Sequence, residues 1–353
     1  MTRTVPRLAL TQGDPAGIGP EILLKLLSEK ETGPVHEDAR GDTPGWQPLL
    51  VAERAALEAL RPSLPHAPWD RLRYLDAPPG PEEALFGDGE IPVLDPVATR
   101  RAITLGDSGP ADAFGAMAAL DAGIALVRSG AADALVTAPV SKSSIARQHL
   151  PGFKGHTDYL AEACGLERYG RDYLMAFLAP ELQVALLTVH VPMREALDAV
   201  EPVTVTEALE CLHRHAGGKI ALAGLNPHAG EGGLLGEEEG RLLVPTVAAA
   251  RERGIDVHGP ESADSLFARA RRGEFDWVLA LYHDQGLIAV KTAAFGLATN
   301  WTLGLPFLRT SVDHGTAFPL AGKGIADAGP MEAVIETTLE LISGTLPRKR
   351  TTE

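Results

Sequence analysis

The chain has 353 residues, and its 32 Lys and Arg against 47 Asp and Glu give a formal net charge of −15. This balance argues against a protein that works on nucleic acid or on an anionic membrane, because no excess of basic side chains is available to contact phosphates over a broad face. With 45% hydrophobic and 22% charged residues, the composition is that of a globular protein with a large core.

The length suggests roughly two domains, at about 150 residues each. Cys164 and Cys211 are the only cysteines. They are too few for a disulfide framework or a cysteine zinc site, so we expect a reducing compartment, the cytoplasm. The first apolar run stops at Gly13, Asp14 and Pro15, and no run of about 18 apolar residues follows. We therefore expect neither export nor membrane insertion.

Short apolar runs alternate with amphipathic, Ala- and Leu-rich segments. In chain order, the strand signals RLALTQ, PLLVA, DALVTAP and QVALLTVHV precede the helix signals EILLKLL, RAALEAL, SKSSIARQ and REALDAV, and the runs KIALAGLNPH and DWVLALYHDQG continue the pattern. This alternation predicts an α/β fold with a largely parallel sheet and helices on both faces.

Two segments lack this periodicity. Residues 32–48 and 77–96 are rich in Gly, Pro and acidic residues, so we predict a surface loop or insertion and a long connection. The run Glu237, Glu238 and Glu239 is predicted to face solvent near the start of a helix.

Near the N-terminus, the strand signal runs into LTQGDPAGIGPEI. Gly13, Gly17 and Gly19 let the backbone approach a ligand closely, and Pro20 suits the first position of a helix. The spacing matches neither the dinucleotide GxGxxG nor the P-loop. A ligand-binding turn and a plain tight turn therefore both stay open.

Three histidines follow apolar runs: His190, His228 and His283. The carboxyl ends of parallel strands form one edge of a sheet, so these imidazoles can converge there as metal ligands. Asp264 and Asp284 add carboxylates for supporting contacts or proton transfer. The alternative is that each histidine is an isolated polar residue at a strand end.

Other polar residues are candidate anion contacts. His156 and Thr157 follow a glycine, although Thr157 could equally cap the helix DYLAEACG. Lys291, Asn300 and Arg309 punctuate an apolar segment, where cations favour phosphate or carboxylate. Further on, His314 and Lys323 lie in the glycine-rich segment SVDHGTAFPLAGKGIADAGPM, which is either a ligand loop or a connection to the last helix.

Together these motifs resemble the 4-hydroxythreonine-4-phosphate dehydrogenases of pyridoxal phosphate (vitamin B6) biosynthesis. The match runs in order through TQGDPAGIGPE, APVSK, GHTDYLA, NPHAGEGG, YHDQG and NWTLGLPFLRTSVDHGTA. It implies the α/β fold of isocitrate and isopropylmalate dehydrogenases, two domains with a cleft between them, and not a Rossmann fold. The expected domains are residues 1–138 with 300–353, carrying the cofactor loop, and 139–299, carrying the metal ligands and a dimer interface.

The resemblance also assigns roles to residues. His190, His228 and His283 would bind a divalent metal such as zinc, magnesium or cobalt, with His283 supplied by the neighbouring subunit of a homodimer. The implied substrate contacts are His156, Thr157, Lys291, Asn300 and Arg309, with the cations on the phosphate. Asp264, Asp284 and Lys291 would be catalytic. NAD or NADP would bind the loop with His314, Gly315, Thr316, Gly322, Lys323 and Gly324. The segment Pro260–Ala263 departs from the family pattern, which puts the distal substrate contacts in doubt.

The implied reaction oxidises the secondary alcohol of 4-phosphooxy-L-threonine to 2-amino-3-oxo-4-phosphooxybutanoate. This β-keto acid would lose CO₂ to give 3-amino-2-oxopropyl phosphate, helped by the same Lewis acid. Related dehydrogenases of 4-phospho-D-threonate or 4-phospho-D-erythronate remain alternatives, whereas a cis-dihydrodiol substrate is disfavoured by Lys291 and Arg309. Two alternatives come from other classes of protein: a phosphate acyltransferase and a non-catalytic binding protein.

Overall fold

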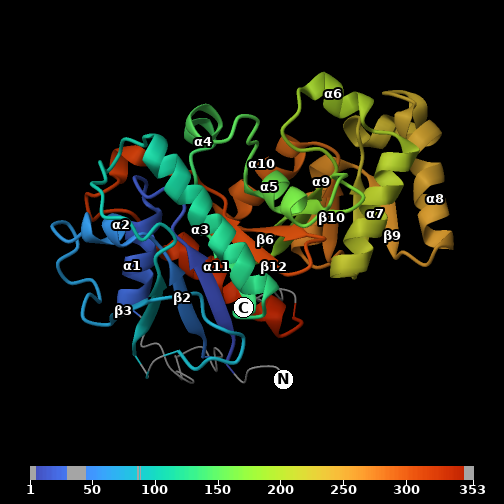
Figure 1. Cartoon of the computed structure of the whole chain (residues 1–353). Helices are drawn as coiled ribbons and strands as arrows, with labels where there is room; N and C mark the ends of the chain where they lie inside the picture. Colours follow the sequence, from blue (N-terminus) through green and yellow to red (C-terminus); the bar gives the residue numbers. More distant parts are fainter. Residues whose placement is uncertain (1–4, 30–44, 86, 88, 346–353) are drawn as a thin grey trace. The chain divides into compact units, whose positions relative to one another are not determined.

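The computed structural model describes residues 5–29, 45–85, 87 and 89–345, so most of the loop predicted over 32–48 lies outside the described residues. The chain divides into two compact units, Met1–Leu160 with Phe307–Leu346, and Ala161–Pro306 (Figure 1). The sequence-based boundaries stood at 138/139 and 299/300. Each unit is described by itself below.

The first unit holds a parallel sheet. Its strands lie in the order β3 (Leu72–Leu75), β4 (Ile91–Leu94), β2 (Gln47–Val51), β1 (Arg7–Thr11), β5 (Ala134–Thr137) and β12 (Leu308–Val312). Neighbouring strands in this order pair in parallel. Every residue of β1 is buried, as expected for a strand covered on both faces.

Helices cover both faces of this sheet. Leu8 and Leu10 of β1 share a core with α1 (Gly19–Glu29) and α11 (Gly329–Ile342). Thr11 and Leu135 point the other way, towards α3 (Pro110–Arg128), where a Cβ on Gly123 would come within 2.7 Å of both. Successive side chains of each strand point to opposite faces of the sheet, so they pack against two different layers of helices. The unit also contains α2 (Arg54–Glu58) and α4 (Lys142–Gln148), while α5 (His156–Ala163) spans the boundary between the units.

α3 has the length and apolarity of a membrane-crossing helix, the one such helix in the part of the chain that the structure describes. Of its most apolar window, 61% is buried inside the protein, which is typical of a core helix.

The prediction of one long connection over residues 77–96 was wrong, because β4 lies within it. Ile91–Leu94 is fully buried and pairs with both β2 and β3. The strand is short and contains Pro92, which lacks an N–H and usually marks an edge or a loop. These two properties concealed it in the sequence.

The second unit has a mixed sheet. The order is β11 (Thr299–Leu303), β6 (Leu174–Ala179), β7 (Leu182–Leu186), β10 (Trp277–Ala280), β8 (Ile220–Ala223) and β9 (Val257–Glu261). β11, β6 and β7 pair antiparallel, whereas β7, β10, β8 and β9 pair in parallel. The tight connection Pro180–Glu181 makes β6 and β7 a hairpin, a local departure from the expected parallel order.

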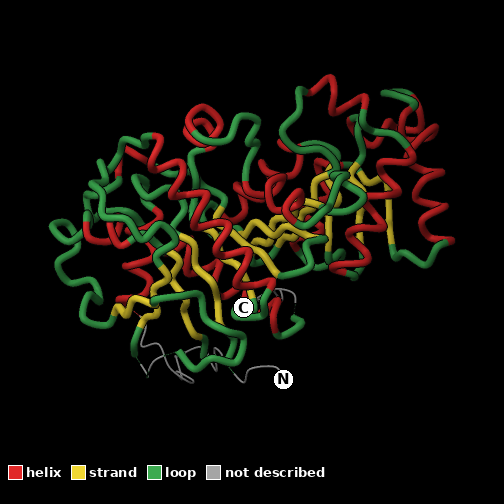
Figure 2. The backbone as a smooth tube through the Cα atoms, in the orientation of Figure 1, coloured by secondary structure: helices red, strands yellow, loops and turns green. Residues whose placement is uncertain are grey.

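Helices flank this sheet as well: α6 (Met193–Asp198), α7 (Pro202–Ala216), α8 (Val244–Glu252), α9 (Ala263–Arg271) and α10 (His283–Ala294) (Figure 2). Val184, Ala221 and Val278 share one buried cluster with residues of α9 and α10. The α/β class predicted from the sequence is confirmed.

Candidate active site

Three histidines of the second unit follow neighbouring strands. His190 comes after β7, His228 after β8, and His283 begins α10 after β10. The ring centroids of His190 and His283 lie 5.6 Å apart. His228 forms a separate pair, with its Nδ1 3.9 Å from Oδ2 of Asp264.

Local hydrogen bonds orient His283. Its Nδ1 lies 2.7 Å from Oδ1 of Asp284. The next residue, Gln285, accepts from the Leu281 N–H at 2.7 Å and donates to the Gly224 carbonyl at 2.8 Å. Gln285 therefore fixes the start of α10 to the ends of β10 and β8, a role that the sequence did not reveal.

His228 lies in a left-handed segment. The φ angles of His228, Ala229, Gly230, Glu231 and Gly232 are 52°, 51°, 79°, 44° and 65°. Residues with a Cβ avoid this region, at a cost of about 1 to 2 kcal/mol each. The surrounding structure must therefore hold this loop in place.

Glu239 holds that loop, so the prediction that it faces solvent was wrong. Its side chain is buried at 4% exposure and accepts from the backbone N–H groups of Leu225 and Asn226 at 2.8 and 2.6 Å. The Asn226 amide also donates to it, at 2.9 Å. The acidic run looked like a solvated face because only one of its members turns inward.

The candidate metal donors are exposed. The side chains of His228, Asp264 and Asp284 are 60%, 66% and 71% exposed, and that of His283 is 39% exposed. The Ser262 hydroxyl donates to Asp264 and lowers the pKa of its carboxyl group, and the nearby His228 lowers it further. Imidazoles and carboxylates suit a divalent metal in kind. Among the described residues, however, they come together in pairs, and no group of three or more could hold an ion.

The first unit contributes a buried cation. Arg309, on β12, is 1% exposed and donates from Nη2 to the Thr137 hydroxyl at 2.6 Å. Burial lowers the pKa of Arg309 to about 9. A guanidinium kept in such surroundings favours an anionic ligand over solvent.

His156 belongs to the same group of residues. Burial lowers its pKa well below the usual range, and the positive charges of Arg309 and Lys142 lower it further. Thr157, the next residue of α5, is 7% exposed. The predicted contacts His156 and Arg309 are thus brought together, and Lys142 joins them as a residue that was not singled out from the sequence.

The remaining predicted contacts lie in the second unit. Lys291 is an exposed residue of α10, and Asn300 is on β11. The buried Oδ1 of Asn300 accepts no hydrogen bond from any described residue.

The predicted cofactor loop connects β12 to α11 in the first unit. A buried carboxylate, Glu21 of α1, accepts from the N–H groups of Gly322 and Ala326 at 3.1 and 2.8 Å. Lys25, 3.3 Å from Glu21, donates to the carbonyls of Gly324 and Ala326 at 2.9 and 2.6 Å. One helix face therefore fixes the Gly322–Gly324 backbone.

The glycine turn after β1 packs against the same loop. Ile18 donates its N–H to the Thr316 carbonyl at 3.0 Å, and a Cβ on Gly17 would lie 3.2 Å from the Cβ of Thr316. At Gly19 a Cβ would lie 2.0 Å from the Gln12 carbonyl oxygen. Close packing by itself requires glycine at position 19 and leaves little room for a side chain at position 17. His314 makes a contact of 3.1 Å with the Gly315 carbonyl, and Lys323 is exposed.

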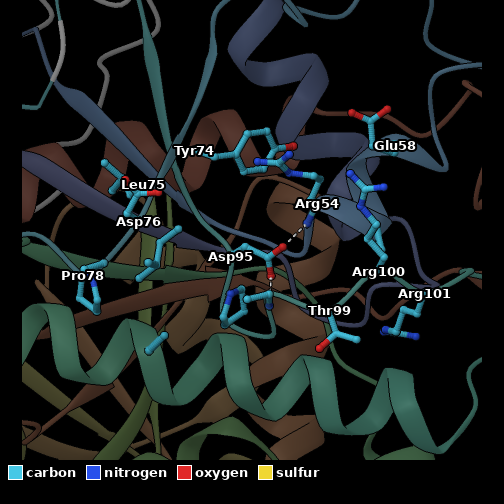
Figure 3. Close-up of a pocket in the computed structure, with 16 residues that line it drawn as sticks. Arg54, Glu58, Tyr74, Leu75, Asp76, Pro78, Asp95, Thr99, Arg100 and Arg101 are labelled. Atoms are coloured by element: carbon cyan, nitrogen blue, oxygen red, sulfur yellow. Dashed lines mark hydrogen bonds between the residues drawn. The ribbon is translucent and has the colours of Figure 1, made fainter.

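A pocket of about 920 Å³ opens elsewhere in the first unit, at the carboxyl ends of β2, β3 and β4 (Figure 3). Its lining includes Arg54, stacked 3.7 Å above the Tyr74 ring, and Arg101, whose guanidinium bonds Glu53 and Asp112. Asp95 accepts from the Arg54 N–H at 3.0 Å. None of the residues predicted from the sequence lines this pocket.

Comparisons with known proteins agree with the motifs. A family model described as "Pyridoxal phosphate biosynthetic protein PdxA" matches residues 46–338. A 4-hydroxythreonine-4-phosphate dehydrogenase of Ralstonia nicotianae is 42% identical, covering 95% of this chain and 97% of its own. A D-threonate 4-phosphate dehydrogenase of Cupriavidus necator is 37% identical, covering 97% and 98%. The crystal structure of the Klebsiella pneumoniae 4-hydroxythreonine-4-phosphate dehydrogenase matches with a TM-score of 0.79 and 34% identity, over 96% and 99% of the chains.

These relatives are dehydrogenases, the solved structure shares the α/β fold described above, and the class inferred from the motifs is confirmed. The chain belongs to the pyridoxal phosphate biosynthetic protein PdxA family.

Proposed function

We propose that the protein oxidises 4-phosphooxy-L-threonine with NAD or NADP to 2-amino-3-oxo-4-phosphooxybutanoate, which decarboxylates to 3-amino-2-oxopropyl phosphate. The observation that carries this proposal is the buried guanidinium of Arg309 beside His156. A buried cation with a second basic group at hand is suited to a phosphate monoester. The sequence resemblance assigns both residues to the substrate.

His190, His228 and His283 would hold the divalent metal. When bound, such an ion supplies a Lewis acid that acidifies the alcohol, polarises the new carbonyl and favours loss of CO₂. The short contact between Asp284 and Nδ1 of His283 would hold the ring in one orientation. Nε2 is then the nitrogen available for coordination. Asp264, with its lowered pKa, is ionised at neutral pH and can accept a proton.

On the substrate side, Arg309, His156 and Thr157 would bind the phosphate, and Lys291 and Asn300 would bind further polar groups. The backbone of Gly322–Gly324, fixed by Glu21 and Lys25, would receive the dinucleotide. His314, Gly315 and Thr316 belong to the same loop. The nicotinamide cofactor held there would supply the acceptor for the hydride of the alcohol carbon.

A homodimer with a shared site is part of the proposal. The second unit also carries large apolar side chains with high exposure: Leu234 83%, Ile288 65%, Phe295 83% and Leu297 47%. Exposed apolar groups of this kind are typical of a protein interface. A second copy of the chain would cover them and supply His283 to the His190 and His228 of its partner.

Mixing inactive subunits tests this arrangement. His190→Ala and His283→Ala proteins should each be inactive, and their co-refolded heterodimers should regain one intact site, up to about half of wild-type activity. His190→Ala mixed with His228→Ala should regain none, because each subunit would supply both of these histidines to one site, so each change inactivates one of the two sites. His190 and His283 of one chain lie close together, so a reverse result is also defined. Rescue only in mixtures that contain His228→Ala would mean that one subunit supplies both His190 and His283 to a site and its partner supplies His228. An active monomer would refute the shared site.

A second candidate is the oxidation of 4-phospho-D-threonate, favoured by the similarity to the Cupriavidus necator enzyme. Steady-state kinetics at 340 nm with NAD and NADP, on a panel of 4-phosphorylated threonine, threonate and erythronate stereoisomers, separates the candidates. The proposed function predicts the highest kcat/KM for 4-phosphooxy-L-threonine. No reduction of either nucleotide with any member of the panel would overturn the dehydrogenase assignment and favour an acyltransferase or a binding protein.

A further inference from the structure

Lys142 lies near Arg309 and His156, the residues proposed to bind the phosphate. It comes from a helix to which the motifs assigned no role. It is the first residue of α4, directly after the Ser141 N-cap that follows β5. Its side chain runs along Gly155: a Cβ at that glycine would lie 2.9 Å from Cε and 3.2 Å from Nζ of Lys142. The lysine thus occupies the space in which a side chain at position 155 would otherwise lie.

Gly155 is suited to this contact by its backbone as well as by its size. Its φ of +146° is a conformation that L side chains rarely adopt, and the residue is buried. The next residue is His156, the first of α5. The absent side chain therefore lets the lysine ammonium approach the start of α5.

Lys142 adds a second positive charge to this group. Lys142 makes no hydrogen bond or ion pair with any described residue, yet its charge and that of Arg309 both act on His156. Two cations and an imidazole therefore lie within electrostatic reach of one another. Such a group is stabilised by an anion that neutralises it, and a phosphate monoester carries close to two negative charges at neutral pH.

We propose that Lys142 binds the substrate phosphate together with Arg309, and that it does so from the space that the glycine at position 155 leaves open. The guanidinium offers a planar pair of donors, while the ammonium is a compact charge that approaches from a different element. The inference rests on the proposed function for the identity of the phosphate ester. The binding of phosphate itself can be measured without turnover.

The first experiment measures binding of inorganic phosphate to the full-length protein by calorimetry. Lys142→Met should weaken binding about 10-fold to 100-fold, as expected for the loss of a charge-assisted hydrogen bond. Lys142→Arg should retain most of it. Lys154→Met is the matched control, since Lys154 is an exposed lysine next to Gly155 that no observation connects to the site. Its affinity should stay within 2-fold of wild type.

A second readout reports the local charge. In an NMR titration, with the His156 resonance assigned by its loss in His156→Gln, Lys142→Met should raise the pKa of His156 and Lys154→Met should leave it unchanged. Phosphate should raise the same pKa in the wild type more than in Lys142→Met. A lysine that only packs its stem against Gly155 would move neither quantity.

Gly155→Ala gives an independent approach. The added methyl should displace the Lys142 head and weaken phosphate binding, and the double variant Lys142→Met/Gly155→Ala should bind no more weakly than Lys142→Met alone. Additive losses would mean that Gly155 acts through strain rather than through the lysine. A melting curve checks that each variant is folded.

The outcomes separate this inference from the proposed function. If Lys142→Met binds phosphate as the wild type does, the lysine is not part of the site, whatever the enzyme oxidises. If Lys142→Met loses phosphate but no phosphorylated alcohol in the panel is oxidised, the anion site stands and the proposed reaction fails. In an active enzyme the change should appear in KM for the phosphorylated substrate, with a smaller effect on kcat.

Discussion

The two units present their candidate site residues in opposite ways. In the first unit, Arg309 and Thr157 are 1% and 7% exposed, so the proposed anion-binding group is built into the fold. In the second unit the donors are exposed, with His228 at 60% and Asp264 at 66%. Burial of a charge costs stability unless it is compensated, whereas exposed side chains contribute little to it. Substitutions should therefore affect folding in the first unit and only binding in the second.

The largest expected effect concerns the exposed histidines. His190→Ala, His228→Ala and His283→Ala should each reduce turnover at least about 100-fold, because losing a ligand removes more metal affinity than losing its supporting contacts. The free energy of unfolding should change by no more than about 0.5 kcal/mol, as for other exposed positions.

His213→Ala, an exposed histidine on α7, is the control and should leave the rate unchanged. Activity within a few-fold of wild type in all three variants and after chelation would show that these residues bind no essential metal.

Arg309→Met tests the buried group of the first unit. The KM for the phosphorylated substrate should rise about 10-fold to 100-fold, while the rate with a dephosphorylated analogue changes little. Because burial already disfavours the charged form of Arg309, the melting temperature should stay equal or increase. Kinetics on both substrates and a melting curve give the two readings. Equal damage to both substrates together with a lower melting temperature would make Arg309 part of the scaffold.

Glu239 is an exception in the second unit, because it is a buried residue that supports an exposed donor. Glu239→Gln leaves an amide facing the Asn226 donors, so Co²⁺ affinity should fall about 10-fold to 100-fold. Stability should fall by about 1 to 3 kcal/mol. A Co²⁺ absorption titration and denaturant unfolding measure these two effects.

Glu238→Gln is the matched control, since Glu238 bonds the same Asn226 amide, at 2.8 Å, from a less buried position. If the two variants behaved alike, burial of Glu239 would have no part in holding the His228 loop.

The smallest effect is on pH dependence in the first unit. The folded pKa of His156 is lowered, so between its ordinary value near 6.5 and that lower value the unfolded chain binds a proton that the folded chain does not. This contribution to stability is present above pH 6.5 and is lost as the pH falls below it. His156→Gln should therefore flatten the decline of unfolding free energy between pH 7 and 5, measured by urea titration. An unchanged slope would mean that His156 titrates normally.

The sequence predicted whatever depends on local pattern. Strand runs such as RLALT and helix runs such as EILLKLL are periodic over their whole length, and both appear where expected. The histidines could be singled out because imidazoles directly after apolar runs are unusual. Arg309 stood out as a cation in an apolar segment.

What the sequence concealed depends on contacts between distant segments. Glu21 differs from any other helix glutamate only because Gly322 and Ala326, some 300 positions away, donate to it. Lys142 acquires its proposed role through Gly155, and Glu239 acquires its role through a loop of left-handed backbone. None of these relations leaves a periodic trace, so only the fold could reveal them.

The left-handed backbone from His228 to Gly232 has a consequence for how this chain can vary. Reflected in a mirror, the segment would be an ordinary right-handed turn, so the handedness of the amino acids works against it at each position that carries a Cβ. Random substitution should therefore be tolerated there mainly as glycine, asparagine or aspartate, the residues that accept this conformation. In a library of variants, Ala229 and Glu231 should drift towards those three, whereas His228 stays fixed if it binds the metal. A semisynthetic chain with D-alanine at residue 229 should be more stable than the natural one, an uncommon case in which inverting a stereocentre strengthens a fold.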